Sequence, residues 1–190
     1  MEKSARRTMV GAVVLVAALG WTSAARATES GADIAGQPPP MAPDARVRGV
    51  TQRMVTVINE AAAGSTTFRG LVATIGSTDG IVYVAEGACG HGVRACLLIT
   101  MTLMGPNRLL RILVDPLKMD DDLMGSIGHE LQHAVEVLSH RNIRSGSAMT
   151  LLYNKEGHKY SGRFETDAAV KAGNAVRAEL RTARSAERRD

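Results

Sequence analysis

The sequence predicts an α+β fold in which antiparallel hairpin strands pack against two helices. Three observations lead to this prediction. Four short runs rich in apolar residues lie between positions 68 and 114, with turn residues between them. An amphipathic helical pattern follows over residues 122–138. A second helical pattern, from about residue 163 to residue 183, lies near the end of the chain.

Residues 1–27 are typical of a secretory signal peptide. They have a basic start, an apolar run over residues 9–20 and the cleavage pattern Ala25-Arg26-Ala27. An apolar run of about 12 residues is too short to span a bilayer, so a membrane anchor is the less favoured alternative. We therefore expect an exported protein, periplasmic or extracellular, with no stable membrane span after cleavage.

The charge of the chain gives no case for nucleic acid as a partner. The whole sequence has 23 Lys and Arg against 19 Asp and Glu, and its pI is about 9.4. Residues 1–27 hold four of the basic residues and one of the acidic ones, which leaves 19 against 18, a net charge of +1. The basic pI thus comes largely from the signal segment. The arginines between residues 177 and 189 are spaced like the solvated face of a helix.

The mature chain is expected to begin with a disordered segment and a helix. Residues 28–43 are rich in proline and polar residues, a composition typical of disorder. A helix is predicted from about residue 44 to residue 64, because apolar residues recur there at spacings of three and four. We expect one domain over residues 44–184, followed by a frayed basic tail over residues 185–190.

Two hairpins are predicted after this helix. The strand-like runs 68–75 and 80–86 are joined through Asp79-Gly80, a hairpin signal. The runs 97–103 and 108–114 are joined through a Gly-Pro-Asn turn. Residues 148–162 show no pattern that assigns them to a helix or a strand.

Cys89 and Cys96 are the two cysteines of the chain, and their close spacing in an exported protein predicts a disulfide that closes a short loop. The alternative is a second metal site formed by Cys89, His91 and Cys96. This alternative is weak, because a fourth ligand is missing.

The helix over residues 122–138 carries the motif His129-Glu130-Leu131-Gln132-His133. Residues four apart share one face of a helix, so both imidazoles can reach the same metal ion, and Glu130 projects beside them. The apolar residues of the helix fall on the opposite side, which predicts that the histidines face away from the core. The pattern predicts a zinc hydrolase in which Glu130 is the general base. A pair of solvated surface histidines is the alternative.

Glu165 is the predicted third metal ligand. If residues 163–183 form one helix, Glu165 projects into its apolar stripe, where a carboxylate is costly unless a positive group meets it. The alternative is an acidic residue placed near a helix N-terminus by the helix dipole. The longer H-E-x-x-H-x-x-G-x-x-H pattern is excluded, because Glu136 and Ser139 stand where it needs Gly and His.

Together these residues resemble the gluzincin group of zinc metallopeptidases. The resemblance rests on the His129–His133 motif and on Glu165-Thr166-Asp167-Ala168, an E-x-x-A setting of the third ligand. It implies a zincin-like fold, one Zn²⁺ ion and an edge strand, within residues 97–103 or 108–114, that pairs with an extended substrate. Many gluzincins have an Asp after that Ala, whereas this chain has Ala169.

The sequence therefore predicts an exported zinc peptidase, a hydrolase whose partner is a peptide or protein substrate. His158, Tyr160 and Tyr153 are the candidates for contacting the oxyanion or the substrate. Two alternatives remain: a non-catalytic zincin-like binding protein that has kept or lost its metal, and a metal-free structural protein. The oligomeric state is not predicted.

Overall fold

The computed structural model describes residues 45–90, 92–160 and 163–189, and the side chains of Lys159, Tyr160 and Arg163 are outside this description. The predicted signal peptide, the segment 28–43 and His91 lie outside the described residues. The described elements are β1 (Val47–Gly49), α1 (Gln52–Gly64), α2 (Thr66–Gly76), β2 (Gly80–Glu86), β3 (Ala95–Leu97), β4 (Thr102–Met104), β5 (Asn107–Val114), α3 (Asp121–Ser139), α4 (Gly146–Glu156), β6 (His158–Tyr160), β7 (Arg163–Glu165) and α5 (Asp167–Glu187).

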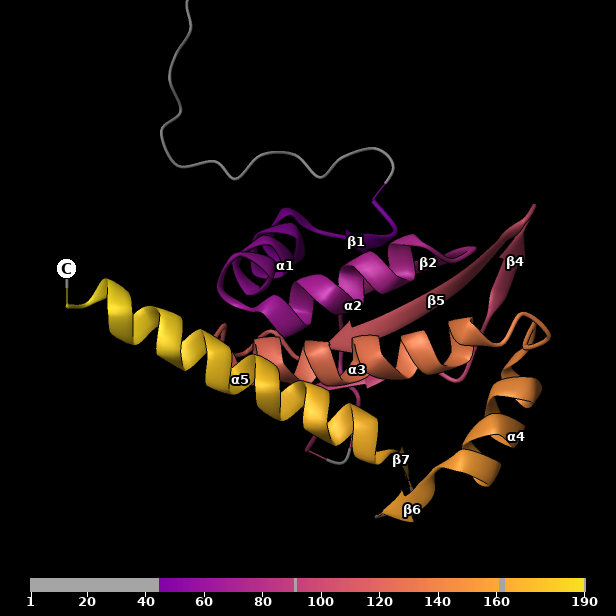
Figure 1. Cartoon of the computed structure of the whole chain (residues 1–190). Coiled ribbons are helices and arrows are strands. Elements are labelled where there is room, and N and C mark those ends of the chain that lie inside the picture. Colours follow the sequence, from indigo (N-terminus) through magenta and orange to yellow (C-terminus); the bar gives the residue numbers. More distant parts are fainter. Residues whose placement is uncertain (1–44, 91, 161–162, 190) are drawn as a thin grey trace, which may run out of the picture. The chain divides into compact units, whose positions relative to one another are not determined.

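The main sheet is mixed, in the strand order β1-β2-β5-β3, with β4 also paired to β5 (Figure 1). Strands β1, β2 and β5 are parallel to one another. Strands β3 and β4 pair antiparallel with the two ends of β5. The α+β class is confirmed, but the prediction of a purely antiparallel sheet is wrong.

The cause of this difference is α2, because residues 68–75 were predicted to be a strand. Phe68, Leu71 and Ile75 are buried and lie three and four residues apart, which is the period of a helix. The Ser65 side chain caps this helix by accepting the Phe68 N–H. The chain therefore crosses from β1 to β2 through two helices, and such a crossover joins parallel strands.

The first predicted helix also begins later than expected. Val47, which falls within the predicted helical range 44–64, lies in β1 and pairs with Val82. Thr51 caps α1 by accepting the Met54 N–H. The strand 80–86 and the turn between β4 and β5 are confirmed, whereas the run 97–103 is divided between β3 and β4.

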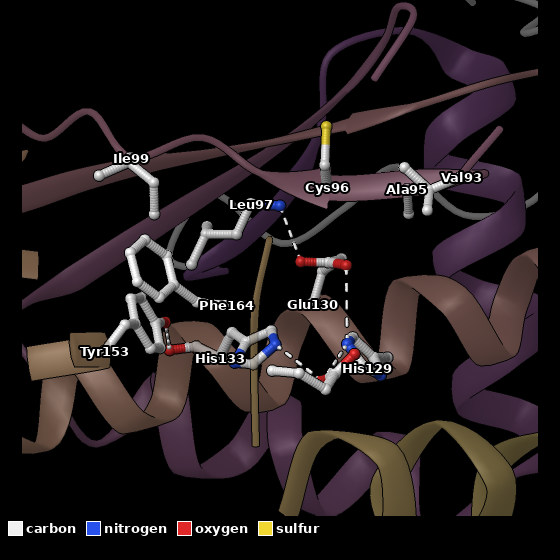
Figure 2. A pocket seen from close by; sticks show the side chains of 11 residues that line it. Val93, Ala95, Cys96, Leu97, Ile99, His129, Glu130, His133, Tyr153 and Phe164 are labelled. Atoms are coloured by element: carbon white, nitrogen blue, oxygen red, sulfur yellow. Dashed lines mark hydrogen bonds and ion pairs between the residues drawn. The ribbon is translucent and has the colours of Figure 1, made fainter. Parts of the chain in front are cut away.

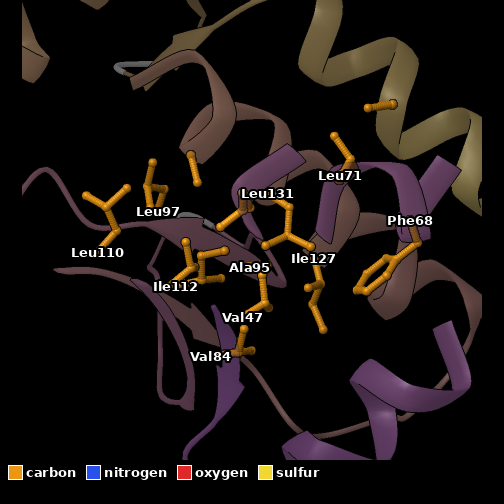
Figure 3. Close-up of a cluster of buried hydrophobic side chains, with 14 of the residues drawn as sticks. Val47, Phe68, Leu71, Val84, Ala95, Leu97, Leu110, Ile112, Ile127 and Leu131 are labelled. Atoms are coloured by element: carbon orange, nitrogen blue, oxygen red, sulfur yellow. The ribbon is translucent and has the colours of Figure 1, made fainter. Parts of the chain in front are cut away.

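The core lies between one face of the sheet and the helices. Alternate residues of β5 are buried, from Arg108 to Val114, so one face of this strand is covered. The buried face meets α1, α2 and the apolar side of α3 (Figure 3). The apolar stripe predicted for α3 is buried except for half-buried Val135.

The end of the chain differs most from the prediction. Residues 163–165 form β7, which pairs with β6, and α5 begins only at Asp167. Helix α5 then crosses α3 and continues to Glu187, past the predicted end at residue 183 (Figure 1). Helix α4 occupies part of the stretch that the sequence left unassigned.

Candidate metal site

Helix α3 carries three of the predicted site residues on the side that faces β3. Asp120 caps the helix by accepting the Leu123 N–H, and two further aspartates in the first turn complement its dipole. Its apolar side is fixed in the core. His129, Glu130 and His133 are consequently turned toward a cavity between α3 and β3 (Figure 2).

Glu165 reaches this cavity from β7, not from a helix. It lies one residue before Thr166, the N-cap of α5, and its backbone pairs with His158 of β6. The argument from a helical stripe was therefore wrong about the position of Glu165. The short hairpin of β6 and β7 brings its carboxylate to the two histidines.

The donor atoms of His129, His133 and Glu165 converge. Glu165 Oε1 lies 3.1 Å from His129 Nε2 and 3.5 Å from His133 Nε2. Ligand atoms of all three residues lie within 4.8 Å of one another, so the group could hold a metal ion. Tetrahedral ligands about 2.0–2.1 Å from a zinc ion lie roughly 3.4 Å apart, and two nitrogens with one oxygen are a set that zinc accepts. These residues fit a zinc ion.

A second carboxylate holds the His133 ring. Glu136 Oε2 lies 2.9 Å from His133 Nδ1, on the opposite side of the ring from Glu165. The Thr166 hydroxyl donates to the other oxygen of Glu136 at 2.7 Å. The Tyr153 hydroxyl donates to the main-chain carbonyl of His133 at 3.0 Å. Histidine ligands of metal sites typically have such a partner on the nitrogen that does not bind the metal.

The two histidines differ in their titration. Burial opposes a charge on His133, but the hydrogen bonds that its ring donates to Glu136 and Glu165 raise its pKa to about 9. Burial and the charge of His133 lower the pKa of His129, and Arg177 acts in the same direction. Burial opposes the charge of Glu136 and Glu165, but the His133 hydrogen bond to each carboxylate keeps its pKa below the usual range. The carboxylates thus provide a negative environment suited to a cation.

Glu130 stands between the histidines and the sheet. Its Oε2 accepts the Leu97 N–H of β3 at 2.7 Å, and its Oε1 lies 3.9 Å from His129 Nε2 (Figure 2). Strand β3 is the last strand in the sheet order, and the hydrogen bonds of Arg94 and Leu98 run to the β5 side. Along a strand, the N–H and C=O groups of successive residues point to alternate sides. The main-chain groups of Ala95 and Leu97 therefore point away from β5 and toward the cavity.

The cavity has a volume of about 240 Å³. The end of the cavity far from His129 has an apolar wall. It is formed by Leu97 and Ile99, which lie opposite the rings of Tyr153 and Phe164 (Figure 2). These two rings stack with centroids 5.8 Å apart. An apolar side chain beside the candidate metal site would be buried there.

The remaining predicted site residues are not all brought together. The Tyr153 ring lines the cavity, but its hydroxyl is engaged with the His133 carbonyl. His158 is exposed in β6, and the side chain of Tyr160 is outside the described residues. Cys89 and Cys96 form the predicted disulfide. This pairing removes the two thiols that the alternative second metal site required.

Three features of the site were missed in the sequence. Glu136 lies three residues after His133, and this helical spacing could have identified it as a partner of the ring. Phe164 and Thr166 flank Glu165 and could be recognised only with the β7 position known. The Leu97 N–H has no signal in the sequence, since every residue except proline carries one.

Comparisons of the chain with protein-family models, with curated proteins and with solved structures found no match. In the described part of the chain, no helix has the length and the apolar character needed to cross a membrane.

Proposed function

We propose that this protein is an exported, zinc-dependent metallopeptidase of the gluzincin type with a zincin-like fold. One observation carries the proposal: the donor atoms of His129, His133 and Glu165 converge in a cavity that also contains Glu130 and borders an open strand edge. The resemblance of the motif to gluzincins supports the same activity.

His129, His133 and Glu165 would hold the zinc ion. When bound, zinc supplies a Lewis acid that polarises a carbonyl group and lowers the pKa of water toward neutrality. Glu130 takes a proton from the attacking water and delivers it to the leaving amine. The Leu97 N–H supports this role, because it fixes one oxygen of Glu130 at 2.7 Å while the other remains on the His129 side.

Strand β3 supports a peptide as the substrate. Its edge offers the main-chain groups of Ala95 and the carbonyl of Leu97 to an extended chain, which would add a strand to the sheet, whereas the Leu97 N–H is held by Glu130. The Cys89–Cys96 disulfide is compatible with export, as is the lack of a membrane-spanning helix among residues 45–90, 92–160 and 163–189. Glu136 gives the His133 ring a carboxylate partner, although the Asp that follows the third ligand in many gluzincins is Ala169 here.

The test is the zinc content of the exported protein, measured together with its hydrolysis of an unfolded protein such as casein. We expect one zinc per chain in the parent, and its loss or strong weakening in His133→Ala and Glu165→Ala. Glu130→Gln should keep zinc and lose about 10²–10⁴-fold in rate, the usual contribution of a general base. The control is Glu156→Gln, an exposed carboxylate of α4 that pairs only loosely with His140.

Three results would contradict the proposal. A parent without zinc after supplementation would leave a metal-free structural protein. Stoichiometric zinc without hydrolysis would indicate a zincin-like binding protein. Hydrolysis that survives Glu130→Gln would reject the assigned mechanism.

A further inference from the structure

A second hollow, of about 280 Å³, adjoins the candidate metal site on the side opposite the apolar wall. It borders His129, Glu130 and Glu165 as the first cavity does. Its distinct lining is polar and basic, and we call it the basic hollow: Gly92, Arg94, Ser126 and Arg177. The candidate site therefore lies between two spaces of different chemistry.

The two spaces follow one another along β3. Arg94 borders only the basic hollow, Ala95 borders both spaces, and Leu97 and Ile99 border only the apolar cavity. A peptide extended along the β3 edge would enter both spaces, with its reacting bond between them. Successive residues of an extended chain advance by about 3.3 Å, so groups one or two residues from that bond would reach each space.

The positive charge of Arg177 is only weakly balanced by ion pairs with carboxylates. Its guanidinium donates to Asn174 Oδ1 at 3.0 Å and to Ser126 Oγ at 3.4 Å. Among the described residues, its recorded ion pair is to Asp122, at 3.7 Å from Nε. The same Asp122 oxygen lies closer, at 2.8 Å, to the guanidinium of Arg181.

Arg94 differs, because its guanidinium is already engaged by Asp120 at 2.5 Å and by the Lys118 carbonyl. Arg177 is also fixed in place, since its stem lies on Gly125, where a Cβ would come within 2.2 Å of Arg177 Cγ. Its side chain is 28% exposed, so the charge is partly shielded from water yet open to the hollow. These properties suit an anion that arrives with a ligand.

We propose that Arg177 determines specificity by binding a carboxylate of the substrate in the basic hollow, while an apolar side chain of the same peptide occupies the cavity beside Phe164. This inference rests on the proposed peptidase function, whose substrate class it narrows. The carboxylate is that of a chain terminus or of an acidic side chain. Both sources offer two oxygens to the guanidinium fork.

The experiment separates binding from turnover. Zinc-loaded Glu130→Gln protein is titrated with fluorescent peptides that share an apolar residue and differ in one group. One pair has a free or an amidated C-terminus, and the other has an internal Asp or Asn. We expect about 10–100-fold tighter binding of a carboxylate form, the usual range for a hydrogen-bonded charge. Whichever pair shows this preference identifies the source of the carboxylate.

Variants at Arg177 then test the assignment. Adding Arg177→Gln should remove the preference without weakening the amide and Asn forms, and Arg177→Lys should retain part of it. Arg184→Gln is the matched control, because Arg184 is on the same helix but pairs with Asp121, so its loss leaves the Asp122 carboxylate near Arg177 undisturbed. It should leave the preference unchanged. Thermal melting of each variant checks that the crossing of α3 and α5 is intact.

The outcomes distinguish the two proposals. If Glu130→Gln protein prefers carboxylate peptides through Arg177 but the parent hydrolyses none, the peptidase proposal is wrong and the anion site stands. If the parent hydrolyses both members of each pair equally, or Arg177→Gln keeps the preference, the anion site is rejected. If Glu130→Gln protein with Arg177 intact binds both peptides of each pair equally, the anion site is also rejected.

Discussion

At His133 both ring nitrogens have an acidic partner, and this arrangement explains why Glu136 is needed. Glu165 lies at Nε2, whereas Glu136 accepts at Nδ1 and is itself oriented by Thr166. A carboxylate on Nδ1 fixes the ring orientation and the tautomer that leaves Nε2 for a metal. The geometry makes Glu136 a positioning residue for the proposed zinc ligand.

Glu136→Gln should weaken zinc binding about 10–100-fold, because the neutral amide gives His133 a weaker partner. The measurement is competition for zinc against a chelating dye, with Glu156→Gln as the matched control on an exposed carboxylate. The melting temperature of the zinc-free variant should stay within a few degrees of the parent. Unchanged zinc affinity would mean that Glu136 does not position the ring.

The sequence identified the residues of the candidate site better than their surroundings. The spacing of His129 and His133 on an amphipathic helix was sufficient, since helical geometry places them together. Glu165 was chosen on the assumption of a helix, but it lies in β7 because Thr166 caps α5 after it. The Thr166 cap and the pairing of β6 with β7 are local contacts, but they do not follow the apolar period from which the helix was predicted.

At the level of elements, the crossing of α3 and α5 depends on glycines. A Cβ on Gly128 would lie 2.8 Å from Val176 Cγ2, and one on Gly173 would lie 3.0 Å from His129 Cβ. The helices therefore approach closely next to the first proposed ligand. This contact could not be predicted from the sequence, because a glycine within a helical pattern signals only reduced helix propensity.

Gly128→Ala should destabilise the protein by about 1–2 kcal/mol, since the stiff Val176 side chain must move and this outweighs the better helix propensity of alanine. Gly70→Ala is the matched control in α2, where an added Cβ meets no atom within 4 Å. It should stabilise by about 0.5–1 kcal/mol. Urea unfolding of both variants checks these signs, and equal effects would show that the helix crossing tolerates a methyl group.

Residues 68–75, in α2, show why a short apolar helix can be mistaken for a strand when only the sequence is known. Residues 68–75 are apolar enough for a strand, and the Asp79-Gly80 pair suggested a hairpin. The buried positions have a helical period, and the Ser65 cap that starts the helix comes before the apolar run. Whether such a run forms a helix or a strand is decided by which face meets the core.

At the scale of the whole molecule, the buried side chain of Arg108 connects the sheet to α3, the helix that carries His129 and His133. Arg108 of β5 is fully buried and donates to the carbonyls of Val137, Leu138, His140 and Ile143, at and beyond the end of α3. Its charge is balanced by Asp79, at 2.6 Å, in the turn before β2. Arg108 thereby satisfies carbonyls that the helix end leaves without partners. The run 108–114 was recognised as a strand, but this role of its first residue was not predicted.

Asp79→Asn should lower the free energy of unfolding by about 2 kcal/mol at pH 7, because the buried guanidinium loses its charged partner. The hydrogen bond from Arg108 holds the pKa of Asp79 below its ordinary value of 3.8. A carboxylate with a depressed pKa contributes stability above its unfolded pKa and loses it as the pH falls through the folded value. The difference between parent and variant should therefore be full above about pH 5 and shrink below pH 3.8.

Urea unfolding at a series of pH values between 7 and 3 measures this difference, with Asp167→Asn as the control on an exposed aspartate. The control should follow the parent more closely at every pH, because Asp167 is exposed in the first turn of α5 and a favourable charge there contributes little. A difference between Asp79→Asn and the parent that stayed constant down to pH 3 would show that the ionised form of Asp79 does not stabilise the fold. In that case the hydrogen bonds of the Asp79 side chain to Arg108, and not its charge, would account for the stability that the variant loses.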